Sequence, residues 1–204
     1  SPDQLFYSAF AVLTQINSYA LMVSNKKTAY EVSSSTNLIH NFSITKPATG
    51  AKTLSFKRSI TSAQKFAWYN AQNGKRYQLK FVFNYKELNQ TGDTTYKKID
   101  WLFPEETTEN TDGSGESDVS YLNEDFYKLC ESKIPYSDQA SENNVVKRFA
   151  SICDLEVTAI GDEFHTYIEA HGPTTGVLME KPNYSNITNG LGLLSCRYQI
   201  HRLI

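Results

Sequence analysis

The chain has no cluster of positive charge and no long apolar run, and each absence excludes a class of protein. Its 204 residues carry 20 basic and 22 acidic side chains, and no run of basic residues is longer than two. Because a nucleic-acid surface needs a concentrated positive field, we expect no nucleic-acid partner. The apolar patch 9–13 is too short to span a bilayer, and the start Ser1-Pro2-Asp3 carries no recognisable export signal.

The sequence also lacks the spacings that mark metal sites and activated nucleophiles. Cys130, Cys153 and Cys196 form no CxxC pair, which speaks against structural zinc. They fit one disulfide, with Cys130 and Cys153 nearest in sequence, or at least as readily three buried thiols. No serine lies in GxSxG and no HExxH is present, so we expect no cofactor or metal. The histidines, which are far apart, are His40, His165, His171 and His201.

The sequence is rich in aromatic residues, and many of them alternate as in a β-strand. It contains 13 tyrosines and 11 phenylalanines, and between residues 76 and 85 large apolar side chains occupy every second position. Phe66 and Trp68 precede this stretch, and Asn73-Gly74 predicts a hairpin turn between the two strands. A tryptophan strand, a turn and a Tyr-x-Leu strand resemble the middle of a fibronectin type III-like sandwich. The alternating residues are Tyr77, Leu79, Phe81, Phe83 and Tyr85.

The remaining pattern predicts a mainly β (α+β) protein: an antiparallel sandwich, in part fibronectin III/Ig-like, with two short helices in its C-terminal half. Asn123 and Asp162 are the expected N-caps of these helices, and His165 is expected on the exposed side of the second. Pro135 and Pro173 lie at the expected ends of these helices. The chain is predicted to form one β-rich domain, 1–204, with an acidic loop at 105–118. Other strands are expected at 20–23, 28–32, 42–45, 54–56, 94–103, 153–157 and 198–204.

Two acidic regions raise the question of a site. Residues 110–118 alternate oxygen-bearing side chains as a calcium loop does, but Tyr121 stands where a bidentate glutamate closes the shell. We therefore expect a solvated loop without metal. Asp154 and Glu156 share a strand face and Glu163 follows soon after, so a hydrolase using paired carboxylates is one alternative. A carbohydrate-binding module is another, with exposed aromatic platforms drawn from Trp68, Trp101 and Tyr136.

Several motifs in the second half together resemble a family. They are the acidic-Phe-Tyr segment 123–129, the segments 155–157 and 164–168, and the tail 181–197 with its Gly190-Leu191-Gly192 core. Residues 66–197 are similar to Bacteroidota cell-envelope lipoproteins of unknown function. The resemblance implies an outer-membrane location and a lipid anchor upstream of Ser1, with this chain as the C-terminal portion of a longer lipoprotein. It also implies Thr94, within Asp93-Thr94-Thr95, as an O-glycosylation candidate.

The tail is predicted to turn at Asn189-Gly190 and then to form a sheet-closing strand from Gly190 to Cys196. Since no coherent catalytic set is present, we expect a non-catalytic envelope protein. It would act as an accessory subunit or binding module of an outer-membrane assembly, with a protein partner and, in the alternative, a glycan.

Overall fold

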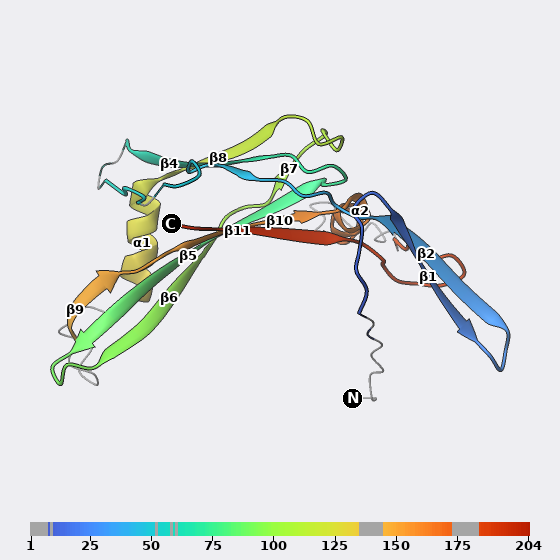
Figure 1. Cartoon of the computed structure of the whole chain (residues 1–204), viewed down its shortest axis with the longest axis horizontal. Coiled ribbons are helices and arrows are strands. Elements are labelled where there is room, and N and C mark those ends of the chain that lie inside the picture. The colour runs from blue at the N-terminus through green and yellow to red at the C-terminus, as the bar shows by residue number, and fades with distance from the viewer. Residues whose placement is uncertain are drawn as a thin grey trace, which may run out of the picture.

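The computed structural model describes residues 8, 10–51, 53–57, 59, 61–134, 145–172 and 184–204. Within these residues the chain is mainly β, with antiparallel sheets and two short helices (Figure 1). The predicted fold class is therefore confirmed. Its elements are β1 (Ser18–Asn25), β2 (Tyr30–Asn37), β3 (Ile44–Lys46), β4 (Ala63–Tyr69), β5 (Arg76–Asn89), β6 (Thr94–Leu102), β7 (Glu106–Thr107), β8 (Glu116–Leu122), α1 (Asn123–Lys133), β9 (Val145–Ala150), β10 (Asp154–Ile160), α2 (Asp162–His171) and β11 (Arg197–Leu203).

The longest strand, β5, organises the largest sheet. One edge of β5 pairs with β10 and then β9, while the other pairs with β6 and the short β7. β11 joins the outer side of β10. The predicted alternation along β5 is confirmed, because Tyr77, Leu79 and Phe81 are fully buried.

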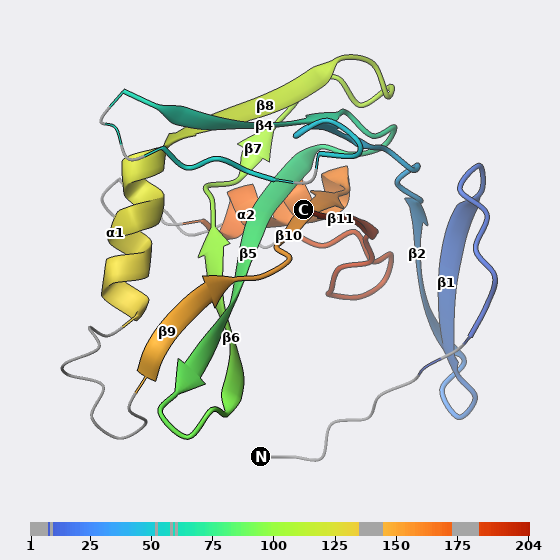
Figure 2. The same ribbon diagram turned by 60° about the vertical axis from the view of Figure 1, so that its left-hand side comes forward.

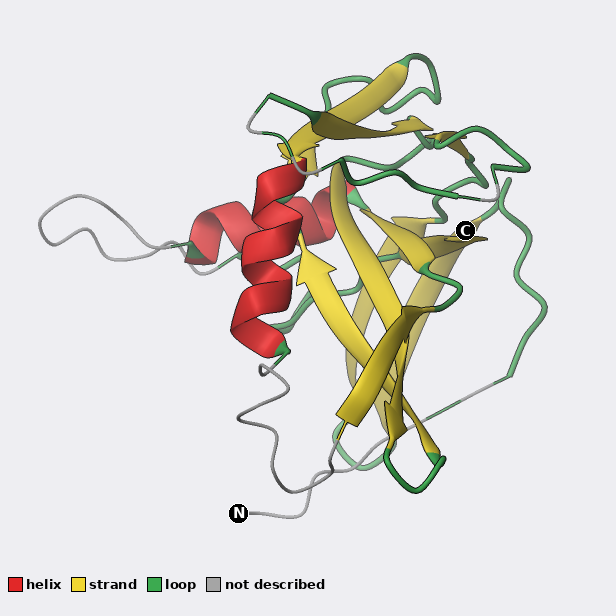
Figure 3. Ribbon diagram, turned by 90° about the vertical axis from the view of Figure 1, so that its left-hand side faces the viewer, coloured by secondary structure: helices red, strands yellow, loops and turns green. Residues whose placement is uncertain are grey.

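A three-stranded sheet, β3-β4-β8, lies over this large sheet (Figure 3). Aromatic rings fill the space between the layers: Phe66 of β4 contacts Phe81 and Phe103, and Trp68 contacts Tyr77. Apolar side chains of β10 complete the core from the same sheet as β5. Burial of this apolar surface is what drives the two layers together.

Helix α1 closes one end of the sandwich through Phe126, which stacks on Phe56 and contacts Phe81. Both helices begin one residue differently from the prediction, because Leu122 and Gly161 occupy the cap positions. Asn123 donates its side-chain N–H to Lys57 O instead of capping the helix. The predicted helix ends at Pro135 and Pro173, and the first residues of the tail, 181–183, lie outside the described residues.

The predicted hairpin at Asn73-Gly74 is wrong, although the turn is real. Asn73 has φ +65°, and Gly74 N donates to Ala71 O. However, β4 pairs with β3 and β8, whereas β5 belongs to the other sheet. The turn therefore carries the chain between the two layers of the sandwich.

Strands β1 and β2 form a separate two-stranded sheet, which we call the arm (residues 18–37). The arm lies beside the two-layered body, and β2 lies between β1 and the body (Figure 2). Both strands are longer than predicted, and the turn lies at 26–29 rather than 24–27. No residue of β1 is fully buried, so this strand is exposed on both faces.

The C-terminal tail holds the arm. Ser33 N donates to Thr188 O, and Thr188 N donates back to Ser33 O. Ser34 Oγ also donates to Asn186 O at 2.7 Å. The predicted turn is present, with Asn189 at φ +58°. The predicted strand from Gly190 to Cys196 is wrong: these residues form a loop, and β11 begins at Arg197.

Candidate functional site

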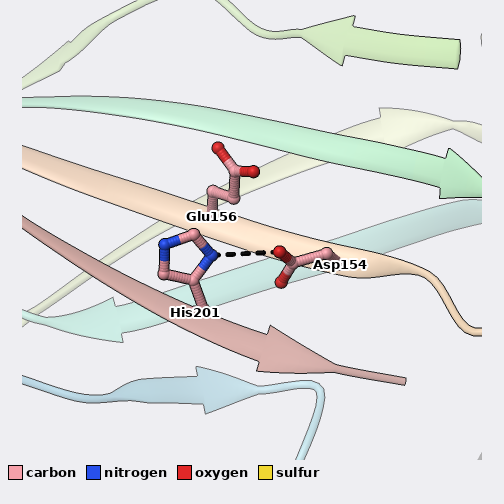
Figure 4. Close-up of side chains that lie close together, drawn as sticks. All are labelled: Asp154, Glu156 and His201. Carbon is pink, nitrogen blue, oxygen red and sulfur yellow. Dashed lines mark hydrogen bonds and ion pairs between the residues drawn. The ribbon is translucent and has the colours of Figure 1, made fainter. Parts of the chain in front are cut away.

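Asp154, Glu156 and His201 form a compact group on adjacent strands β10 and β11 (Figure 4). The strand register places His201 opposite Glu156, and Asp154 Oδ2 lies 3.0 Å from His201 Nδ1. One potential ligand atom from each residue lies within 4.8 Å of the others. Two carboxylates and an imidazole are donor types that suit a divalent cation.

Lys80 already supplies a positive charge to this group. Its Nζ lies 2.5 Å from Glu156 Oε2, and Gln199 Nε2 donates to the same oxygen at 3.1 Å. The hydrogen bond to Glu156 raises the pKa of Lys80 above its ordinary value, outweighing the opposing effect of desolvation. A metal ion would have to displace this ammonium from Glu156. The arrangement therefore fits a cross-strand ion-pair network better than a metal centre.

The structure does not gather all three carboxylates of the hydrolase alternative. Asp154 and Glu156 meet on the sheet, but Glu163 lies on α2, where Thr36 Oγ1 donates to it at 3.2 Å. The hydroxyl of Ser195 lies 3.5 Å from its other oxygen. Glu163 lines a different feature, a polar cavity of about 290 Å³. That cavity is lined by Asn37, Asn73, Lys75, Glu109, Thr111, Asp162 and Glu163.

His165 was predicted on the exposed side of the second helix, and this prediction is wrong. The side chain is half-buried and contacts Arg76. Arg76 Nε donates to His165 Nδ1 at 3.2 Å, and its guanidinium also pairs with Glu105 and Glu169. The histidine thus accepts a hydrogen bond in an ionic network between β5 and α2. This contact uses the ring nitrogen that a general base would need.

The three cysteines are free and half-buried. Of the two alternatives given by the sequence, the structure therefore has three thiols and no disulfide among these residues. Burial raises the pKa of the Cys130 thiol to about 11, and burial also raises that of Cys153. Since the thiolate is the nucleophile, both residues are poorly suited to covalent catalysis.

The acidic loop is organised by the protein itself. Asp112 Oδ1 accepts from Ser114 N at 2.8 Å, and Ser117 Oγ donates to Asn70 Oδ1 at 2.6 Å. These contacts direct loop oxygens toward the chain instead of a common cation. Within the 105–118 stretch lie β7 and the first residues of β8.

The aromatic platforms of the glycan alternative are mostly internal. Trp68 is fully buried. Trp101 is half-buried and packs against Phe103 and Tyr121, while Tyr136 lies outside the described residues. The observed placement of the two tryptophans therefore favours core packing over an exposed sugar-stacking surface.

Several large apolar side chains on and just before the arm are exposed. Leu21, Met22 and Val23 are 47%, 66% and 52% exposed. Leu21 and Val23 point to one face of β1 and Met22 points to the other, so apolar side chains are exposed on both faces of this strand. The two strands were predicted from the sequence, but the exposure of their apolar side chains was not; the absence of charge from 18–25 was the available signal. The exposed apolar residues between 10 and 30 are Phe10, Val12, Leu13, Ile16, Leu21, Met22, Val23 and Tyr30.

The modification candidate Thr94 is the first residue of β6, is exposed, and pairs with Leu88. Its position beside the β5–β6 turn leaves the hydroxyl accessible from solvent, which O-glycosylation requires. The assignment of this residue stays a prediction.

Comparison with known proteins adds no relative: no family model, no curated protein and no solved structure matches the chain. Among the described residues, neither helix has the length and apolar character needed to cross a membrane.

Proposed function

We propose that this protein is a non-catalytic cell-envelope protein that serves as an accessory subunit or binding module of an outer-membrane assembly. The observation that carries the proposal is the arm: a two-stranded sheet that pairs with neither of the larger sheets and has exposed apolar side chains on its outer strand. A lone two-stranded hairpin is marginally stable in water. A partner that binds the arm would account for the presence of such a hairpin beside a well-packed body.

The body supports a binding role rather than a catalytic one. Glu156 is engaged by Lys80, His165 by Arg76, and the Cys130 thiol has a raised pKa. These contacts occupy three of the described groups that could serve as acid, base or nucleophile. The envelope location rests on the family resemblance of the 66–197 segment.

The test is co-purification from native membranes with a tagged chain and two matched variants. Leu21→Lys places one charge on the arm, where Leu21 is 47% exposed, whereas Leu102→Lys places one on β6, where Leu102 is 60% exposed. We expect enrichment in the membrane fraction and a partner that is retained by Leu102→Lys but lost with the arm variant. Recovery of only soluble monomer, without membrane enrichment, would contradict the proposal.

A further inference from the structure

The pairing of β2 with the tail reveals which backbone groups of β1 face outward. Ser33 exchanges both its backbone hydrogen bonds with Thr188, so its N–H and C=O point away from β1. Ser33 lies opposite Met22. In an antiparallel ladder, such a pair turns the groups of both residues to the outer edges. Met22 therefore directs its N–H and C=O outward, and alternation gives the same direction to Ser18, Ala20 and Ser24.

Among the described residues no strand pairs with the outer edge of β1, and β1 has none of the features that usually protect an edge strand. Edge strands are commonly protected by charges, prolines or bulges, which discourage pairing with another chain. Among the described edge strands, β6 carries Lys97 and Lys98, β8 carries Asp118, and β11 carries Arg197. Strand β1 has no charged residue and no proline, and its register with β2 runs without a shift. This edge is therefore suited to accept another strand.

We propose that β1 pairs with β1 of a second copy of this chain, antiparallel and centred on Leu21. The inference rests on the proposed binding role of the arm and names its partner. A two-fold axis perpendicular to the sheet keeps each side chain on its own face of the sheet. Directly opposed residues of the two copies point to the same face, so the axis must pass between the two copies of a single residue, which we call the centre of the pairing. With Leu21 at the centre, all four outward-facing residues pair with one another: Ser18 with Ser24, and Ala20 with Met22, of the second copy.

The alternative centre at Met22 is poorer, because it places Ser18 opposite Lys26, which lies in the turn beyond the strand. Centring on Leu21 gives about eight intermolecular backbone hydrogen bonds, two for each of four pairs. One face then carries an apolar stripe, with Leu21 beside Leu21 and Tyr19 beside Val23 of the second copy. Because β1 is uncharged, no like charges meet within the paired strands.

The register is tested by disulfide trapping in the full chain. Leu21→Cys places two thiols at a directly opposed pair with Cα atoms about 4.5 Å apart, within disulfide reach. Val23→Cys is the matched control, because the two copies of this position lie about 14 Å apart along the strand. After oxidation with diamide, we expect covalent dimer from Leu21→Cys, and none from Val23→Cys or the unmodified chain with its half-buried cysteines.

The affinity is tested by sedimentation equilibrium with Met22→Pro. This change removes an outward N–H and leaves the N–H groups that face β2 in place, so the arm can still form. We expect the unmodified chain to dimerise and Met22→Pro to weaken dimerisation about tenfold or more, since both copies lose a hydrogen bond. The Thr188-bonded amide of Ser33, followed by hydrogen exchange, reports whether the arm remains docked.

Two results would overturn self-pairing: a chain that stays monomeric at millimolar concentration, or trapping at Val23→Cys in place of Leu21→Cys. A monomer that still captures another membrane protein through the arm refutes self-pairing and leaves the binding role intact. A dimer that shows no membrane enrichment would support self-pairing and contradict the proposed role in an outer-membrane assembly.

Discussion

Ser33 of β2 and Thr188 of the C-terminal segment exchange two backbone hydrogen bonds, 3.3 and 2.8 Å long. This pairing connects the N-terminal and C-terminal parts of the chain and adds a one-residue bridge to the inner edge of the arm. Gly190 allows the close approach, because a Cβ there would lie 3.1 Å from Val32 Cγ1. The tail therefore acts as the support of the arm.

Thr188→Pro tests this support. Proline lacks the N–H that Thr188 donates to Ser33 O, and a hydrogen bond of this kind contributes about 1 kcal/mol. We expect the Ser33 amide to exchange roughly five- to tenfold faster by hydrogen-exchange mass spectrometry or NMR. Thr188→Ala keeps the backbone donor and is the control. Equal exchange in the two variants would show that the bridge does not hold the arm.

The local chemistry of the chain was largely predictable, whereas its long-range pairing was not. The period-two pattern of Tyr77 to Tyr85 predicted a strand with one buried face, and burial confirms it. Asn73-Gly74 predicted a turn, which is present. What the turn connects depends on which strands pair across the chain, and a local sequence pattern carries no information about that choice.

The contacts of the candidate site could not be predicted for the same reason, because they depend on which strands pair. Asp154 and Glu156 could be placed on one strand face from sequence, but their contacts with His201 and Lys80 required knowledge of two neighbouring strands. The half-burial of His165 follows from its contact with Arg76, a residue distant in sequence. The role of the tail was hidden for the same reason, because the strand it supports is at the opposite end of the chain.

Cys130 is predicted to react slowly with iodoacetamide. Its pKa is raised from 9.0 to about 11 by burial, so the thiolate fraction near neutral pH falls about 100-fold. We expect alkylation in the folded chain to be slower by about that factor than in urea, measured by peptide mass spectrometry. The protonated thiol is favoured in the folded state, so its stabilising contribution is lost as pH rises from 9 through about 11. Equal folded and unfolded rates would refute the burial of this thiol.

The Lys80–Glu156 pair is expected to couple more strongly than an exposed pair. Lys80 and Glu156 side chains are 31% and 13% exposed, whereas those of Lys65 and Asp118 are 42% and 43% exposed. Double-mutant cycles with Lys→Met and Glu→Gln or Asp→Asn should give about 1 kcal/mol for the first pair and about half or less for the second.

The pH dependence of that coupling has a definite sign. Because the pKa of Lys80 is raised in the folded state, the stabilisation is complete below the ordinary lysine value of 10.5 and is lost as pH rises through the folded pKa. Urea unfolding of the cycle at neutral and strongly alkaline pH measures this. A coupling that grew with alkalinity would contradict the assignment.

Of two conservative core substitutions, we expect the one that removes less volume to destabilise the fold more. Trp68 is fully buried and its indole N–H has no hydrogen-bond partner among the described residues, so Trp68→Phe removes an unsatisfied donor while creating a cavity. Tyr77→Phe removes little volume but deprives the Ala71 N–H of its 2.7 Å acceptor, which costs about 1–3 kcal/mol. We expect Tyr77→Phe to lower the free energy of unfolding more than Trp68→Phe does. The reverse order in urea unfolding would show that cavity cost dominates here.

The most direct test of the account is site-specific photo-crosslinking in intact cells of the source organism. A photoreactive residue is placed at Met22 on the outer edge of the arm, or at Leu102 on β6, where exposure is similar at 66% and 60%. We expect a discrete cross-linked product in the membrane fraction from position 22 and none from position 102. Products from position 102 alone, or from neither position, would contradict the claim that the arm is the binding surface of this protein.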